Sequence, residues 1–222
     1  MNSFSIYIVR HGITEWNRQE RMQGHSDIPL DSEGRIQAEK ISCRLAEVRP
    51  KIQQVWSSDL SRAVETAEAI ARPLGIAIAT TPLLRETHLG EWEGLTREDI
   101  QARGEGDKLE DYRKDPYLHR PPGGETLDAA WGRMNHVLED IRNSASNLRI
   151  AIVGHGGSLR ALIANCLEMS PCTMRHISLD NASLSIIEES GSNEYRMIRL
   201  CLLNDVSHLR CINPSCCNSL TR

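Results

Sequence analysis

The sequence of 222 residues has no segment dense in lysine or arginine, and its formal net charge is −4 at pH 7. Nucleic acids and anionic membrane surfaces are bound through basic patches, so the composition argues against both kinds of partner. Any anion that this protein binds must be held by a local arrangement of a few residues.

Long apolar runs are also absent. Residues 1–9 have neither the basic start nor the extended apolar stretch of a signal peptide, and no run approaches the length of a membrane span. We therefore expect a cytoplasmic protein without a membrane partner. The sequence is compatible with a homodimer.

The sequence gives little support for a metal site. The histidines do not occur at ligand spacings such as H-x-x-x-H, and the seven cysteines are an odd number, typical of free thiols in a reducing compartment. Cys211, Cys216 and Cys217 are grouped but lack a histidine or a second cysteine pair. We predict no metal and no cofactor, and a flexible tail over residues 210–222.

Helical and strand patterns alternate along the chain. Apolar strands are expected near residues 6–9, 52–56, 75–79, 150–153, 183–188 and 195–202. Stripes of apolar residues three and four apart predict helices between them, one from Asp31 and a long one from Leu127. This order predicts an α/β fold, a three-layer sandwich whose mostly parallel central sheet is flanked by helices.

Residues 96–122 interrupt this alternation. They are polar and mixed in charge, with only short helices expected, and a Pro-Pro-Gly-Gly segment closes them. We interpret them as a small lid inserted in a single domain that spans residues 1–209.

Residues 10–17 read R-H-G-I-T-E-W-N and directly follow the first apolar strand. A glycine after the Arg-His pair lets the backbone turn sharply and pack close to a small ligand. Open α/β sheets form their ligand crevice at the carboxyl ends of the strands, where this pair lies. An Arg-His-Gly tripeptide alone is weak evidence, because a strand end can carry two polar residues without any function.

Three further segments strengthen this evidence. Residues 57–63, S-S-D-L-S-R-A, place Arg62 in the first turn of a helix, where free N–H groups favour an anion. Residues 84–90 carry Glu86 in a loop, and residues 154–158, G-H-G-G-S, repeat the order of strand, histidine and glycine turn.

Together these segments resemble the signature of the histidine phosphatase superfamily, over residues 6 to about 209. The resemblance implies that His11 is a nucleophile that forms a phosphohistidine. It implies that Arg10 and Arg62 hold the phosphoryl oxygens bidentately, and that His155 is a second histidine, either charged or a hydrogen-bond donor. The arginines would fill the electrostatic place of a cation.

Glu86 resembles the proton donor to the leaving oxygen in this family. Glu91 and Glu93 lie in the same run and are expected to be solvated, and His88 is expected to be an exposed loop histidine. The resemblance further suggests minor contacts to the substrate from Asn17 and the backbone of Gly24. Gly156, beside His155, completes the predicted substrate-binding set.

Phosphatases and cofactor-dependent phosphoglycerate mutases share this set of residues. The short lid of mixed charge and the following P-G-G-E-T favour a phosphatase of small phosphorylated metabolites. Residues 179–183 and 203–209 resemble the phosphoserine and α-ribazole phosphatases. A phosphoglycerate mutase is the alternative. A non-catalytic module that binds a phosphorylated ligand is disfavoured, because every catalytic position is filled.

Overall fold

The structure is a computed structural model that describes residues 2–116, 118–143, 148–191 and 196–210. Within these residues a six-stranded sheet has the order β3-β2-β4-β1-β5-β6. The strands are β1 (Asn2–Arg10), β2 (Gln54–Ser58), β3 (Ile78–Thr81), β4 (Leu148–Gly154), β5 (Leu184–Gly191) and β6 (Arg196–Asp205). The first four strands are parallel, and β5 and β6 add antiparallel at one side.

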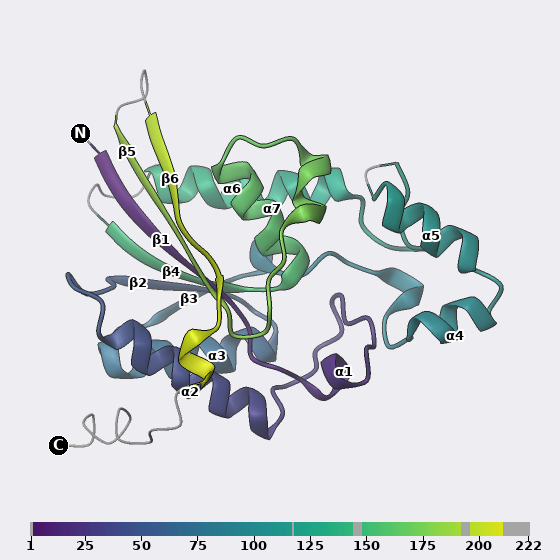
Figure 1. The fold of residues 1–222 in the computed structure, drawn as a ribbon, viewed down its shortest axis with the longest axis horizontal. Helices are drawn as coiled ribbons and strands as arrows, with labels where there is room; N and C mark the ends of the chain where they lie inside the picture. Colours follow the sequence, from purple (N-terminus) through teal and green to yellow (C-terminus); the bar gives the residue numbers. More distant parts are fainter. Residues whose placement is uncertain (1, 117, 144–147, 192–195, 211–222) are drawn as a thin grey trace.

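Helices cover both faces of this sheet (Figure 1). One face carries α2 (Ser32–Ala46) and α3 (Ser61–Leu74), and the other carries α6 (Leu127–Asn143) and α7 (Gly156–Cys166). The predicted three-layer α/β sandwich is confirmed. Burial on both faces explains why residues 150–153 of the central strand β4 are all apolar and fully buried.

The register of the central strands brings the motifs together. Arg10, the last residue of β1, lies beside Gly154, the last residue of β4, and Ser57 of β2 lies beside Val153. The loops that follow these three parallel strands therefore leave the same edge of the sheet. The short helix α1 (Glu15–Arg18) follows the first of them, with Thr14 as its N-cap.

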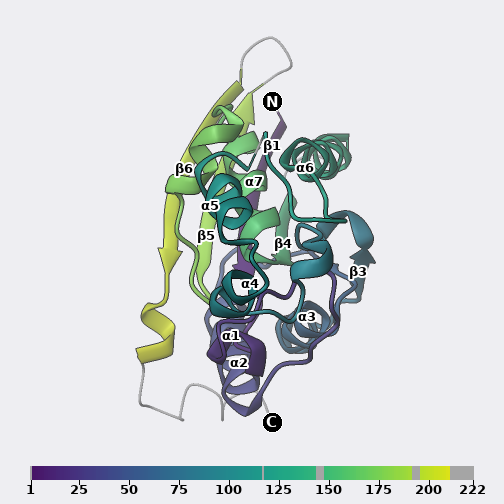
Figure 2. The same ribbon diagram turned by 90° about the vertical axis from the view of Figure 1, so that its right-hand side faces the viewer.

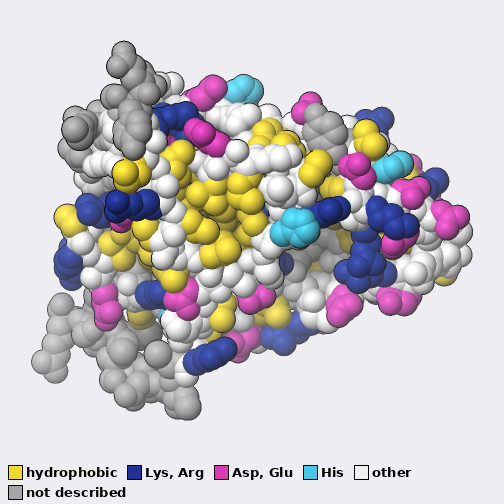
Figure 3. Space-filling model, turned by 45° about the horizontal axis from the view of Figure 1, so that its top comes forward, with side chains coloured by type: hydrophobic (Ala, Val, Ile, Leu, Met, Phe, Trp, Pro, Cys, Tyr) yellow, Lys and Arg dark blue, Asp and Glu magenta, His cyan; other side chains and the backbone are white. Residues whose placement is uncertain are grey.

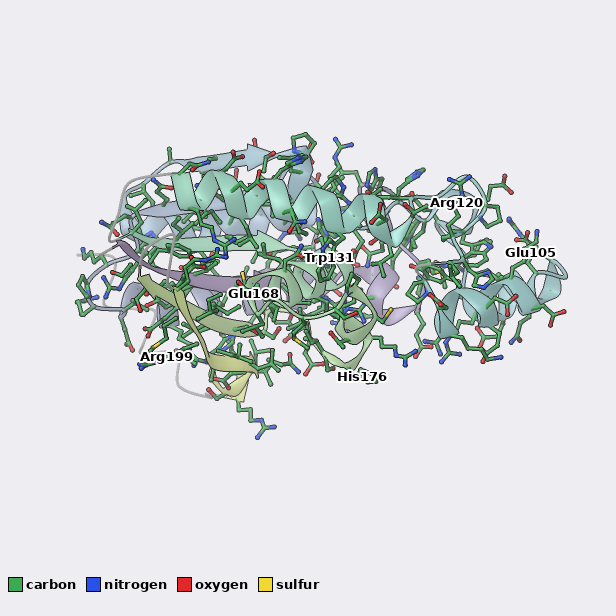
Figure 4. All side chains as sticks on the ribbon, turned by 90° about the horizontal axis from the view of Figure 1, so that it is seen from above. Glu105, Arg120, Trp131, Glu168, His176 and Arg199 are labelled. Carbon is green, nitrogen blue, oxygen red and sulfur yellow. The ribbon has the colours of Figure 1, made fainter. Side chains whose placement is uncertain are left out.

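The segment that we interpret as a lid, residues 96–122, contains α4 (Arg97–Ala102) and α5 (Gly106–Lys114), which project beyond this edge (Figures 1 and 2). In Figure 4 the labelled Glu105 and Arg120 mark the lid, well separated from Trp131 on α6. A small separate core of Trp92, Ile100 and Leu109 holds the two lid helices. The 3-10 helices are η1 (Pro82–Leu84), η2 (Gly90–Trp92), η3 (Pro171–His176) and η4 (Ser207–Arg210).

Some element boundaries differ from the prediction. The third strand begins at Ile78 instead of Gly75, because Gly75 adopts a left-handed conformation (φ 68°) that ends α3. Among the described residues no helix is long and apolar enough to cross a membrane. Of the predicted tail, residues 210–222, Arg210 instead ends η4, and residues 211–222, with the three cysteines, lie outside the described residues.

Candidate active site

His11 lies just beyond the carboxyl end of β1 and is 3% exposed. Its Nδ1 is 2.7 Å from the carbonyl oxygen of Gly12. A carbonyl only accepts, so Nδ1 carries the hydrogen and the lone pair is left on Nε2. Burial, with the nearby Arg62 and Arg10, holds the pKa of His11 well below its usual value, which keeps the ring neutral.

The turn after His11 is tightly packed. A side chain at Gly12 would collide with the backbone of Gly34 in α2, so only glycine fits there. The Gly12 N–H donates to Thr66 Oγ1 over 3.2 Å, and Asn181 Nδ2 donates to the His11 carbonyl over 3.1 Å. The backbone of the candidate nucleophile is therefore fixed from two sides.

Arg62 lies in the first turn of α3, as predicted, and its side chain is fully buried. Its Nη1 and Nη2 donate to the carbonyls of Ser26 and Gly24, and its Nε donates to His155 Nδ1. Burial lowers its pKa to about 10, so it stays charged at neutral pH. The free N–H groups expected at this helix start are partly used, because Asp27 accepts from the Ser61 N–H.

His155 caps the start of α7, and its ring centroid is 5.1 Å from that of His11. Because Nδ1 accepts from Arg62, the hydrogen is on Nε2, which donates to Ser58 Oγ over 2.8 Å. Burial and the Arg62 charge hold its pKa well below the usual value. Of the two predicted states, this arrangement favours a neutral donor over a charged ring.

Arg10 contains an unsatisfied buried donor. Its Nη1 donates to the carbonyl of Leu179 over 2.6 Å, whereas its buried Nε has no hydrogen-bond partner among the described residues. Burying a donor without an acceptor is costly, and such groups commonly mark places where a ligand supplies the acceptor. Gly156 lies against this guanidinium, as a Cβ built there would be 3.6 Å from Arg10 Cζ.

Glu86 reaches the same place from the loop after η1. Its carboxylate accepts from the N–H groups of Gly157 and Ser158 at the start of α7, over 2.9 and 3.0 Å, and from the Thr87 N–H over 2.8 Å. The start of a helix is a favourable position for a carboxylate. The structure thus brings Arg10, His11, Arg62, Glu86 and His155 into one site.

The prediction that Glu91 and Glu93 are both solvated is wrong for Glu93. Glu91 is exposed as expected, but the Glu93 carboxylate is mostly enclosed and accepts from the His25 N–H, Ser26 Oγ and the Leu89 N–H. Glu93 therefore joins residues 24–26, which hold Arg62, to the loop that carries Glu86. Glu91 accepts none of these three hydrogen bonds among the described residues and is exposed to solvent.

His88 lies in the loop after η1, as predicted, and 41% of its side chain is exposed. Its ring lies 4.8 Å from that of His25, and its Nε2 is 3.5 Å from a Glu93 oxygen, so these two residues cover the remainder of the side chain in part. Gly24 has φ 52°, and its carbonyl accepts from Arg62. The Asn17 Oδ1 accepts from Thr14 and Asn181, so this side chain also supports the turn after His11.

Sequence reasoning missed Ser58, Thr66 and Asn181. Ser58 ends β2 at the same sheet edge as His11 and His155, and its position in S-S-D-L was the available signal. Thr66 looks like an ordinary helix residue, and nothing in its pattern marks it.

Among the described residues no three His, Cys, Asp or Glu side chains are grouped to hold a metal ion.

Comparisons with known proteins agree with this geometry. Residues 6–200 match the model of the histidine phosphatase superfamily (branch 1). The chain is 36% identical to phosphoglycerate mutase-like protein 4 of Arabidopsis thaliana over 207 residues, 92% of this chain and 86% of that protein.

Two solved structures share the fold. The mycobacterial glucosyl-3-phosphoglycerate phosphatase has a TM-score of 0.78 and 32% identity, over 90% of this chain and 98% of that one. The phosphoserine phosphatase of Entamoeba histolytica has a TM-score of 0.77 and 25% identity, over 93% and 99%. The chain therefore belongs to the histidine phosphatase superfamily and is similar along almost its whole length to enzymes of the phosphatase or mutase type.

Proposed function

We propose that this protein is a phosphomonoesterase that hydrolyses small phosphorylated metabolites through a phosphohistidine on His11. The observation that carries the proposal is a neutral His11, with Nδ1 tied to the Gly12 carbonyl and Nε2 left as a nucleophile. Arg10, with its unpartnered Nε, and the charged Arg62 supply donors for phosphoryl oxygens.

In the first step His11 Nε2 attacks phosphorus and forms an N–P bond, while the ester P–O bond breaks and its electron pair stays on the leaving oxygen. Glu86 gives that oxygen a proton, so an alcohol leaves. In the second step water attacks phosphorus, the N–P bond breaks, and the Glu86 carboxylate takes a proton from the water. The products are the alcohol and inorganic phosphate.

Glu86 must take up a proton before it can act as an acid. Its carboxylate accepts three backbone N–H bonds, which hold both oxygens at the start of α7, beside the Arg10 guanidinium.

The lid favours hydrolysis over mutase activity. A mutase must exclude water and hold a second acidic group, typically with several lid cations. Here Lys108 pairs with Glu105, and Arg113 and Lys114 pair with Glu110, all on the lid itself. Basic and acidic side chains are interspersed over this end of the molecule in Figure 3. We infer that water reaches the phosphohistidine under this lid and attacks it without a metal ion. We also propose that the enzyme is cytoplasmic.

A phosphoglycerate mutase remains the second candidate, because relatives at 36% and 35% identity are named as mutase-like or as probable mutases. The test is a product assay with 3-phosphoglycerate, with and without 2,3-bisphosphoglycerate, beside phosphoserine, nucleotides and other phosphomonoesters. We expect phosphate release from several esters and little exchange of phosphoglycerates. Fast exchange that depends on the bisphosphate, with negligible free phosphate, would identify a mutase instead.

A further inference from the structure

An ion pair lies behind the segment that carries Glu86. Arg133, on α6, donates from Nε to Glu125 Oε1 over 2.8 Å and from Nη2 to Glu125 Oε2 over 2.9 Å. Both side chains are largely enclosed, with 19% and 13% of their surface exposed. A bidentate pair in this setting is more rigid than a pair of exposed charges.

The same two residues hold the backbone on both sides of Glu86. Arg133 Nη1 donates to the carbonyls of Leu83 and Arg85 over 2.5 and 3.1 Å, and Nη2 lies 3.4 Å from the Glu86 carbonyl. Glu125 Oε2 accepts from the His88 N–H, and the Glu125 N–H donates to the His88 carbonyl. One ion pair therefore fixes residues 83–88.

The Glu86 side chain points away from this pair, toward the start of α7. Its carboxylate is thus held by α7 and its backbone by α6. His25 Nε2 adds a donor to the Glu86 carbonyl over 2.8 Å. Among the described residues neither Arg133 nor Glu125 makes a hydrogen bond to Arg10, His11, Arg62 or His155, so the most direct route from the pair to the reaction is the backbone of Glu86.

We propose that Arg133 and Glu125 are positioning residues that set the location of the proposed acid Glu86 relative to the leaving oxygen. This inference rests on the proposed function. A misplacement of a reacting group by about 1 Å costs on the order of 100-fold in rate. Loss of the pair should therefore slow formation of the phosphohistidine only from esters whose leaving oxygen needs the proton from Glu86.

The test compares Arg133→Met with Arg142→Met. Arg142 lies on the same helix and forms a similarly enclosed pair with Glu189, distant from the site, so it is a matched control. We expect Arg133→Met to lower kcat/KM on alkyl phosphates such as phosphoserine by about 100-fold and kcat/KM on p-nitrophenyl phosphate by less than about 3-fold. The comparison uses kcat/KM because this ratio reports formation of the phosphohistidine, whereas kcat also includes the hydrolysis step, in which Glu86 serves both substrates. Arg142→Met should change both substrates by less than about 3-fold.

A double variant separates positioning from general damage. Because both changes remove the same proton transfer, Glu86→Gln with Arg133→Met should be no slower on alkyl phosphates than Glu86→Gln alone. Equal losses in kcat/KM of Arg133→Met on both ester types, or fully additive losses, would overturn the inference. Should that variant fail to fold, Arg133→Lys decides in the same assay, since lysine keeps the charge but cannot make the bidentate contact.

The proposed function can fail separately. If wild-type protein releases no phosphate from any ester, the proposed function is wrong. If Glu86→Gln shows no preference for aryl esters, the acid is wrongly assigned. If Glu86→Gln shows that preference and neither Arg133 variant does, only the positioning inference is wrong.

Discussion

Arg62 Nε donates a 3.1 Å hydrogen bond to His155 Nδ1, and both side chains are almost completely buried. This contact fixes the hydrogen of the His155 ring on Nε2 and keeps that ring neutral beside a charged guanidinium. The remaining Arg62 donors hold the carbonyls of Gly24 and Ser26. A single arginine therefore joins the loop after α1 to the second histidine of the site.

Arg62→Lys should abolish most activity, because lysine cannot reach these three acceptors and a phosphoryl group together. We expect kcat/KM on phosphomonoesters to fall by at least about 100-fold. The control is Arg72→Lys on the same helix, where Arg72 forms an exposed pair with Glu39 and the change should be less than about 2-fold. Similar losses in both variants would contradict the assignment.

Acid should destabilise the native protein through His11 and His155. Their native pKa values lie well below the unfolded value of about 6.5, so the unfolded chain binds more protons and the free energy of unfolding drops as pH falls below that value. Each histidine contributes up to about 1.4 kcal/mol per pH unit. Urea titrations at pH 7.5 and 5.5 should show a smaller loss in His11→Gln than in wild type, by about 1 kcal/mol. Equal losses would mean that His11 is not buried as a neutral ring.

Gly24→Ala should cost more stability than Gly75→Ala. Both glycines have positive φ, 52° and 68°, so alanine is strained at either position. A Cβ at Gly24 would also collide with the Glu93 carboxylate and the Leu89 backbone, whereas nothing lies within 4 Å of one at Gly75. We expect about 1 kcal/mol for Gly75→Ala and about 3 kcal/mol or more for Gly24→Ala in urea unfolding. A similar cost at both positions would show that the Glu93 contact is readily rearranged.

Chelators should leave the activity unchanged, because the arginines fill the place of a metal cation in the proposed mechanism. Dialysis against EDTA followed by the phosphate-release assay measures this directly. Strong inhibition that added metal reverses would mean that the mechanism lacks an essential ion.

The sequence was sufficient to predict those features that depend on neighbouring residues. His11 and His155 follow strands whose apolar pattern can be recognised, Ser58 ends another, and parallel strands end at one edge. The sandwich fold follows from the same alternation. Even so, Ser58 was overlooked because a serine at a strand end is common, and only the 2.8 Å contact with His155 distinguishes it.

Features that depend on the packing of loops could not be predicted from local sequence patterns. Glu93 holds His25 and Ser26, which are more than 65 residues away in the chain, so no local pattern separates it from the exposed Glu91. Arg133 similarly looks like a polar position of an amphipathic helix. Its contacts with residues 83–86 arise only when α6 packs beside η1.

The most direct test of the central claim is to trap the covalent intermediate. Wild-type protein and His11→Ala are mixed briefly with a ³²P-labelled substrate, quenched in denaturant, and the labelled peptide is identified by mass spectrometry. We expect an acid-labile, base-stable phosphoryl group on His11 of the wild type and none on His11→Ala, which remains folded. Label on a serine or an aspartate would contradict it.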